Sequence, residues 1–329
     1  MHLLCVPHVF LPLCSSLHLD YPALDRLHPE YQDTAVALLD PSKVDLATAA
    51  RYTACERFWQ RLTSERWTAP PVNVARHGNS WKRAFLELHL AGLIESYVPS
   101  PDGANLAALL HEAAAARPFV HSLTVTQMLP QLDLAKVLDG FTHLSSLTVR
   151  MGTGSVGMGY DPARQGMPLS GALSIARLLA TTRSLLSLTL DENMLTDETT
   201  HVLARGLLGS STLTALSLRH NKIADAGAQT LARVIAAHPT LMSLSLAHNN
   251  ITETGALALA QALSGASSGS GSNPGAGSYL RTLDLSLNII NDAGAAAVLN
   301  AATSSVSLEK LNLAACNAGA RSAQVCAST

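Results

Sequence analysis

The chain has 329 residues, 47% of them hydrophobic, and a formal net charge of -2 at pH 7. This content is enough for a continuous core in one large or two ordinary domains, so disorder is not the default. A net charge so close to zero argues against binding nucleic acid or anionic lipid through the whole surface. The five cysteines are scattered and form no Cys-x-x-Cys pair, so we expect neither a disulfide framework nor a zinc site.

Residues 1–19 form an apolar N-terminal tail. The tail contains no Lys or Arg, and Pro7 and Pro12 interrupt a helix, so it is a poor secretory signal and a poor membrane span. We expect it to dock on its own protein or on a partner, and we expect no membrane insertion. A cleaved signal peptide is the alternative.

Residues 20–68 predict a small all-α module of short helices that is broken at Asp40-Pro41. This segment resembles an F-box, a helical adaptor-binding module, although His28 separates Leu27 from Pro29 where an F-box normally has Leu and Pro adjacent. Residues 69–104 follow as a hinge and a capping helix, which we expect to seal the first repeat through the apolar stripe Leu86, Leu90, Leu93, Ile94 and Tyr97.

A basic segment with aromatic residues lies within this region. Residues 51–83 hold seven basic residues against two acids, together with all three tryptophans of the chain. Such interleaving can bind single-stranded nucleic acid by stacking. We favour Trp59 and Trp67 as the core of the helical module, with the charges facing an acidic protein.

Residues 105–329 are dominated by the repeated pattern LxxLxLxxN. Its clear copies begin at Leu185, Leu213, Leu241, Leu280 and Leu308. The intervals 185 to 213, 213 to 241 and 280 to 308 are equal, and their common length lies within the leucine-rich-repeat range. The alternating leucines predict a short strand, and the second half of each unit predicts a helix. With two earlier strands near residues 120 and 144, the sequence predicts about seven strands in an α/β leucine-rich-repeat solenoid, a horseshoe with parallel strands on the concave face and helices on the convex face.

Two repeats are longer than the others. The interval from Leu144 to Leu185 exceeds the regular spacing, and the excess falls near residues 151–166, between strand and helix. The interval from Leu241 to Leu280 is also too long, and its excess falls in the Gly/Ser-rich segment 264–278. Both are predicted to be loop insertions.

Polar residues recur at fixed repeat positions. An asparagine ladder, which we expect to satisfy backbone groups of adjoining turns, consists of Asn193, Asn221, Asn249 and Asn288. Predicted helix N-caps, each followed by an acid that suits the helix N-terminus, are Thr196, Thr252 and Asn291.

No catalytic or metal-binding arrangement is visible in the sequence. The expected concave positions carry small polar groups without a nucleophile beside a base or a close carboxylate pair. His220 and His248 are equivalent in their repeats, but without a third ligand we expect a solvated pair. We therefore predict no enzyme activity, no cofactor, no metal and no small-molecule substrate.

Two sets of residues are candidates for protein binding. Arg177, Arg205 and Arg233 recur at the regular repeat interval and should form a row on the convex helices, suited to an acidic helix or coiled coil. The alternative is an ordinary solvated face. The second set is expected on the concave face and consists of Arg150, Asp191, Arg219 and Asp284.

The F-box-like segment beginning LDYPALDRL, the GNSWKR helix and the ribonuclease-inhibitor-type repeats together resemble the T-complex-associated testis-expressed family, the leucine-rich-repeat subunit of the nexin–dynein regulatory complex of motile cilia. The resemblance covers most of residues 20–329. It implies a non-enzymatic scaffold of the cytoplasmic axonemal cytoskeleton in cilia and flagella, which contributes to assembly and to regulation of motility. The implied partners are other regulatory-complex subunits, including coiled-coil proteins, and dynein or microtubule-associated neighbours, with no nucleic acid and no membrane.

Two other functions remain open from the sequence. An F-box joined to leucine-rich repeats is the arrangement of a substrate receptor of a cullin ubiquitin ligase, which would bind its adaptor through Leu27 and Pro29. A GTPase activator built on the same repeats would supply Arg150 or Arg219 to the nucleotide.

Overall fold

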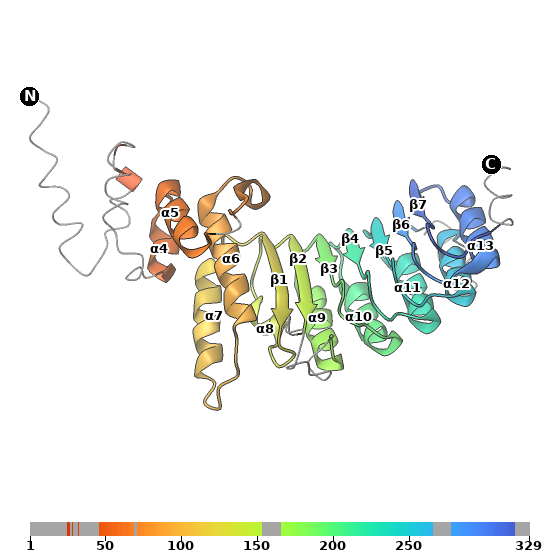
Figure 1. Cartoon of the computed structure of the whole chain (residues 1–329), viewed down its shortest axis with the longest axis horizontal. Coiled ribbons are helices and arrows are strands. Elements are labelled where there is room, and N and C mark those ends of the chain that lie inside the picture. Colours follow the sequence, from red (N-terminus) through yellow and green to blue (C-terminus); the bar gives the residue numbers. More distant parts are fainter. Residues whose placement is uncertain are drawn as a thin grey trace, which may run out of the picture.

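The computed structural model describes residues 25–26, 28, 32, 46–68, 71–152, 166–265 and 278–319. Within these residues seven parallel strands form one sheet in chain order (Figure 1), which confirms the predicted α/β leucine-rich-repeat solenoid. The strands are β1 (Ser122–Met128), β2 (Ser146–Met151), β3 (Ser187–Thr189), β4 (Ala215–Ser217), β5 (Ser243–Ser245), β6 (Thr282–Asp284) and β7 (Lys310–Asn312).

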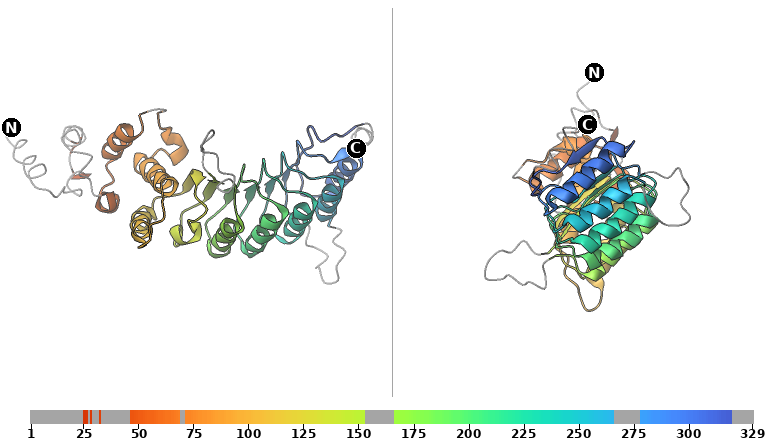
Figure 2. Two further views of the ribbon diagram at one scale, coloured as in Figure 1. Left: turned by 60° about the horizontal axis from the view of Figure 1, so that its bottom comes forward. Right: turned by 90° about the vertical axis from the view of Figure 1, so that its right-hand side faces the viewer.

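One helix separates each pair of neighbouring strands, and Figure 2 shows these helices side by side in a single layer along one side of the sheet. Parallel strands lie about 4.8 Å apart, whereas packed helices need about 8–10 Å, so the solenoid curves with its strands on the inner side. Among the described residues no helix has the length and hydropathy to cross a membrane. The helices are α8 (Leu134–Val137), α9 (Leu169–Thr181), α10 (Asp197–Gly209), α11 (Asp225–Ala237), α12 (Glu253–Leu263) and α13 (Asn291–Ser304).

The register of the sheet follows the leucine pattern. Each central strand leucine pairs with the equivalent leucine of the next repeat, as Leu188 does with Leu216 and Leu216 with Leu244. These three side chains are at most 3% exposed. The apolar rungs therefore stack directly on one another and form one continuous core.

The asparagine ladder links each repeat to the one before it. Asn221 donates from Nδ2 to the carbonyl oxygens of Leu190 (3.1 Å) and Arg219 (3.0 Å), and its Oδ1 accepts from the backbone N–H groups of Asn193 and Leu195, both at 3.0 Å. The four asparagines are between 0% and 7% exposed. In the last described repeat Cys316 stands in the same position and donates from Sγ to the carbonyl of Leu285 at 3.1 Å.

Acids at the helix starts form a second set of links between repeats. Asp225 accepts from the backbone N–H groups of Thr252 (2.8 Å) and Gly255 (3.0 Å), and its Oδ2 accepts from the Thr252 hydroxyl at 2.6 Å. The fit is close, since a Cβ added at Gly255 would lie 2.6 Å from Asp225 Oδ1. Asp197 at the start of α10 bonds the next repeat in the same way, since it accepts from the backbone N–H of Ala224 at 2.8 Å.

Of the three predicted N-cap residues, one caps its helix through its side chain and two do not. Thr196 caps α10 as predicted, because its hydroxyl accepts from the backbone N–H of Thr199. Thr252 precedes α12 but donates its hydroxyl to Asp225 and makes no cap bond. The prediction for Asn291 was wrong because α13 begins at that residue, which follows Ile290 as N-cap.

The elements before the sheet include the α-helices α4 (Leu46–Tyr52), α5 (Glu56–Arg66), α6 (Trp81–Glu95) and α7 (Ala104–Ala116), with the short 3-10 helix η2 (Val74–His77) between α5 and α6. Helix α6 packs against β1, α5 packs against α6, and the buried Phe58 and Trp59 of α5 belong to the same core as the leucine rungs. The predicted division of the N-terminal part at residues 68 and 69 stays a prediction. The tail 1–19, Leu27 and Pro29, and most of both insertions (153–165 and 266–277) lie outside the described residues.

A buried carboxylate joins the N-terminal helices to the first strand. Glu87 in α6 is 2% exposed. Its oxygens accept from His77 Nδ1 at 2.5 Å, from Arg83 Nε at 2.9 Å, and from the backbone N–H groups of His121 and Ser122, both at 2.8 Å. One side chain thus holds the turn before α6, the helix itself and the start of β1.

A second carboxylate of α6 serves the other half of the same strand. Glu95 accepts from the backbone N–H of Thr126 at 2.6 Å and from its hydroxyl at 2.7 Å. Strand β1 is the edge of the sheet, where backbone N–H groups lack a neighbouring strand. Glu87 and Glu95 supply the missing acceptors, so α6 closes this edge with hydrogen bonds as well as apolar contacts.

We expect Asn249→Ala to destabilise the protein by about 3 kcal/mol, because it removes the acceptor of the Ile223 N–H and the donor to the Leu218 and Leu246 carbonyls in a buried loop. The midpoint of urea unfolding, followed by circular dichroism, measures the change. Asn250→Ala is the matched control, since the neighbouring Asn250 is exposed and should change stability by no more than about 0.5 kcal/mol. Equal effects of the two substitutions would contradict the ladder.

We expect Glu87→Gln to change how stability depends on acid. Burial acts to raise the pKa of Glu87, but hydrogen bonds from His77, Ser122, His121 and Arg83 outweigh it and hold the pKa below the ordinary value of 4.5. The carboxylate therefore stabilises the fold above pH 4.5, and this contribution is lost as the pH falls through the lowered pKa.

Unfolding measured between neutral and acid pH should show the Glu87→Gln variant about 2 kcal/mol less stable at pH 7 and less sensitive to acid than the parent. Glu65→Gln is the control, because the Glu65 side chain is 42% exposed and pairs with Arg61 on its own helix. Parallel pH curves for the parent and the Glu87 variant would exclude a stabilising role for this carboxylate.

Candidate protein-binding site

The concave face of the solenoid is lined by small polar side chains. On either side of each central leucine the strand residues are half-buried, as the pattern of β3, β4, β5 and β6 shows. They lie in register, so that Thr189 is next to Ser217, which is next to Ser245. The result is a shallow surface without bulky groups at its centre.

Three of the four residues predicted for the concave face meet in one network. Arg219 reaches Asp284 two repeats away, with Nη2 to Oδ2 at 2.8 Å. Asp191 accepts from the Ser217 hydroxyl at 2.6 Å and from the backbone N–H of Arg219 at 2.8 Å. Burial acts to raise the pKa of Asp284, but hydrogen bonds from Ser286 and Arg219 hold it below its usual range. The charges on this part of the face are therefore paired within the chain.

The fourth predicted residue, Arg150, is apart from this network. Its Nη1 lies 2.8 Å from Glu192 Oε2, and both side chains are about half exposed, at 55% and 50%. A guanidinium offered to a nucleotide must be free to reach it. Arg150 and Arg219 are both engaged with carboxylates of their own chain.

The three arginines predicted for the convex face are exposed on successive helices, Arg177 on α9, Arg205 on α10 and Arg233 on α11. They are not equivalent. Arg177 Nη2 lies 3.1 Å from Asp133 Oδ2, just before α8. Arg205 and Arg233 have no ion pair, hydrogen bond or ring contact with the described residues.

The repeat-equivalent histidines form a close pair. The rings of His220 and His248 have centroids 4.2 Å apart and are tilted by 32°. Both residues are exposed, and both have positive φ, at 51° and 55°. In the described part of the chain no group of three His, Cys, Asp or Glu residues is placed to hold a metal ion.

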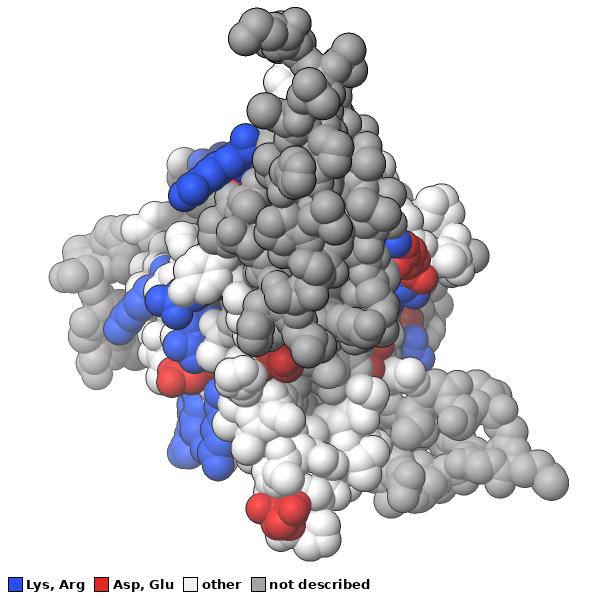
Figure 3. Space-filling view, turned by 90° about the vertical axis from the view of Figure 1, so that its left-hand side faces the viewer, with Lys and Arg blue, Asp and Glu red and all other residues white. Residues whose placement is uncertain are grey.

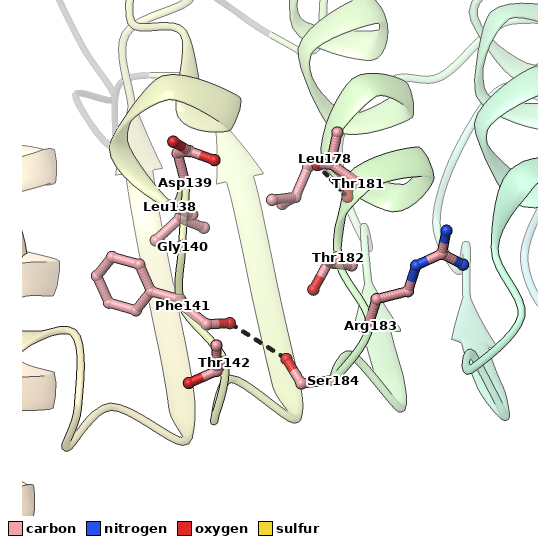
Figure 4. A pocket seen from close by; sticks show the side chains of 10 residues that line it. All are labelled: Leu138, Asp139, Gly140, Phe141, Thr142, Leu178, Thr181, Thr182, Arg183 and Ser184. Carbon is pink, nitrogen blue, oxygen red and sulfur yellow. Dashed lines mark hydrogen bonds between the residues drawn. The ribbon is translucent and has the colours of Figure 1, made fainter.

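A surface pocket lies where the short α8 meets the end of α9 (Figure 4). Its polar groups are largely engaged: the Ser184 hydroxyl donates to the carbonyls of Phe141 (3.2 Å) and Leu144 (2.9 Å), and Arg183 Nη1 donates to Ser211 at 3.3 Å. The lining includes no His, Cys or Lys that would activate a nucleophile. We assign this pocket no chemistry.

Basic side chains gather mainly along one side of the N-terminal end of the molecule (Figure 3). Part of the predicted basic segment is used internally, since Lys82 Nζ donates to the Thr53 carbonyl at 2.8 Å and lies 4.0 Å from the Phe119 ring centroid. Trp59 is completely buried, and Trp67 packs edge-on against Phe85 at 5.4 Å. Trp59 is a core residue and presents no stacking surface for bases, and Trp67 is partly buried against the same core.

Asp133, which pairs with Arg177, was not singled out from the sequence. Ala247 was expected on the concave face, but the sequence did not show that it occupies the position of Arg219 in the repeat that Arg219 crosses to reach Asp284. Ala247 is 4% exposed. Both contacts depend on the distance between repeats, for which the residue types alone give no signal.

Comparisons with known proteins agree with the repeats. A family model described as a leucine-rich repeat matches residues 209–232, 237–260 and 278–299. Dynein regulatory complex subunit 5 of Chlamydomonas reinhardtii is 32% identical over 178 residues, which is 54% of this chain and 44% of that protein. The subunit of the same name from Mus musculus is 29% identical over 161 residues, 49% of this chain and 29% of that protein. The chain thus spans less than half the length of these relatives, and the resemblance to this subunit predicted from the sequence is confirmed.

Among solved structures, the C-terminal domain of tropomodulin from Caenorhabditis elegans matches 49% of this chain and 90% of that one, at 16% identity and a TM-score of 0.38. An internalin from Listeria monocytogenes matches 62% of this chain and 57% of that one, at 18% identity and a TM-score of 0.32.

We expect Arg219→Ala to raise the pKa of Asp284, because it removes a charged hydrogen bond and leaves burial acting on the carboxyl. Since Arg219 is 49% exposed, the loss of stability should be no more than about 1 kcal/mol. Carboxyl carbon chemical shifts, followed by NMR during an acid titration, report the pKa. Arg281→Ala is the control, because it removes an ion pair with Glu309 that does not include Asp284. It should leave the pKa of Asp284 unchanged. An unchanged pKa in Arg219→Ala would mean that the pair is absent in solution.

Proposed function

We propose that this leucine-rich-repeat chain is a non-enzymatic scaffold subunit of the axonemal dynein regulatory complex in cilia and flagella. The similarity to dynein regulatory complex subunit 5 from several organisms is the observation that carries the proposal. In this role the chain holds neighbouring subunits in place and so contributes to assembly of the complex and to regulation of motility.

The architecture supports a holding role. A stack of repeats with a continuous core presents a large preformed surface, so a partner can bind without much loss of chain entropy. The two faces offer different chemistry. The concave face is shallow, small-polar and internally paired, whereas the convex face carries the arginine row at Arg177, Arg205 and Arg233.

The absence of enzyme activity is part of the proposal. The pocket between α8 and α9 holds one carboxylate, Asp139, without a His, Cys or Lys beside it, and the Arg150 and Arg219 side chains of the concave face pair with Glu192 and Asp284. Other subunits of the complex, including coiled-coil proteins, are the proposed partners. We propose the convex face as the main binding surface, because its arginine row includes unpaired charge.

We expect charge reversal at Arg177, Arg205 and Arg233 to weaken incorporation of the tagged chain into axonemes without unfolding it, since all three side chains are exposed. Fluorescence of the tagged protein in motile cilia and co-purification with the regulatory complex measure incorporation. The matched control reverses the exposed Arg76, Arg183 and Arg281, which gives the same change in net charge on other surfaces.

Normal incorporation of the convex variant would exclude the arginine row as a contact. Absence of the unmodified chain from cilia would overturn the proposed function itself. Circular dichroism and thermal unfolding of each purified variant establish that the fold is kept.

A further inference from the structure

Three neighbouring rows of exposed and half-buried positions cross the solenoid on the convex helices. The middle row holds Arg177, Arg205 and Arg233 and ends at Gln261 of α12. The row one turn earlier in each helix reads Leu173, His201, Gln229 and Leu257, and the row one turn later reads Ala180, Leu208, Ala236 and Ser264. None of these twelve positions holds an acid; the nearest acids are Asp133, which pairs with Arg177 at 3.1 Å, and the exposed Glu198, one turn before His201 on α10.

Exposed leucines flank the arginines on both sides. Leu173 is 50% exposed, Leu208 is 52% exposed and Leu257 is 40% exposed. Leu208 follows Arg205 by three residues on the same helix, and so lies directly beside it. We call Leu173, Arg205, Leu208, Arg233 and Leu257 the convex patch. It combines apolar area with positive charge, which is the composition of a protein contact.

Arg205 and Arg233 of this patch form no ion pair with any residue that the structure describes. In the described repeats the other arginines are engaged: Arg150, Arg177, Arg219 and Arg281 pair with carboxylates, Arg183 donates to Ser211, and Arg117 lies over the Phe141 ring. The described part of the chain thus supplies a partner for each of these other arginines, but not for Arg205 and Arg233 on the neighbouring helices α10 and α11. An incoming carboxylate would meet no competing acid of the chain in these rows.

The spacing of the two free arginines selects the kind of partner. Neighbouring helices pack about 8–10 Å apart, so Arg205 and Arg233 present two charges at about that interval along the solenoid. An α-helix rises about 1.5 Å per residue, so positions seven residues apart are separated by about 10.5 Å on nearly the same face. A helix lying along the arginine row would therefore meet it with acidic residues repeated every seven positions.

We propose that the convex patch docks an acidic amphipathic α-helix that crosses α9 to α12 along the solenoid. One glutamate or aspartate per heptad pairs with Arg205 and Arg233, and aliphatic residues beside these acids cover Leu173, Leu208 and Leu257. This assignment rests on the proposed scaffold function and specifies the chemistry of the partner that the scaffold holds.

The test uses the full chain and a synthetic helical peptide of three heptads, about 21 residues, long enough to cross about 30 Å of the solenoid. The peptide carries one glutamate in each heptad with leucines on either side, and circular dichroism verifies its helicity. A second peptide has the same composition, with the glutamates moved to opposite faces of the helix. Fluorescence anisotropy at low ionic strength measures binding of each peptide.

The first peptide should bind more tightly than the second, and added salt should weaken it. Arg205→Glu with Arg233→Glu should weaken binding at least about tenfold. The control pair Arg183→Glu with Arg281→Glu, which makes the same charge change elsewhere, should bind as the parent does. Leu208→Ser is a second variant that should weaken binding without reversing a charge.

Equal binding of the two peptides, equal effects of the two charge reversals, or no binding by the parent chain would each overturn the docking site. These outcomes are separate from the fate of the proposed function. A chain that fails to bind the peptide but enters axonemes keeps the scaffold role and loses the convex patch. A chain that binds the peptide but is absent from axonemes keeps the patch and loses the role.

Discussion

The structure depends on satisfying the backbone of its loops. Each repeat turns twice between strand and helix, and the turn after the strand is buried, where an unpaired N–H or carbonyl costs about 1–3 kcal/mol. Asn221 removes this cost for two repeats at once, since its amide bonds Leu190 and Arg219 while its oxygen accepts from Asn193 and Leu195. Because the bonds run between repeats, no repeat is complete alone, and stability belongs to the stack.

The two faces differ because of this stacking. On the inner side strands are close, so a side chain as long as Arg219 spans an intervening repeat and reaches Asp284, and the face neutralises itself. On the outer side the helices are farther apart, and the acids at their starts are directed to the next repeat, as Asp225 is to Thr252 and Gly255. Of the convex arginines, only Arg177 has a carboxylate of the described residues in reach, that of Asp133.

The sequence predicted the features that follow from the regular repeat length. The spacing of the leucines predicted the strands and their parallel stacking, and the recurrence of Asn221 and Asn249 at one repeat position predicted the ladder. Contacts that depend on the distance between elements were not predictable. Glu87 is one of several polar residues of α6, yet its carboxylate bonds a turn, its own helix and an edge strand. The four residues predicted for the concave face do lie there. The ion pair between Arg219 and Asp284 was not predictable, because Arg219 reaches across the repeat of Ala247, and a pattern within one repeat does not show such a contact.

An unpaired arginine on a convex helix costs the fold little, because water solvates it, and an exposed ion pair returns only about 0–1 kcal/mol. Arg205 and Arg233 can therefore set the position and orientation of a partner more than they can supply its affinity. The affinity has to come from apolar area, and Leu173, Leu208 and Leu257 provide it beside the charges at 40–52% exposure. If charge alone held the partner, salt would release it and the flanking leucines would be dispensable. If apolar area alone held it, acid spacing on the partner would not matter. The convex patch has both features, so both dependences should be found together in one contact.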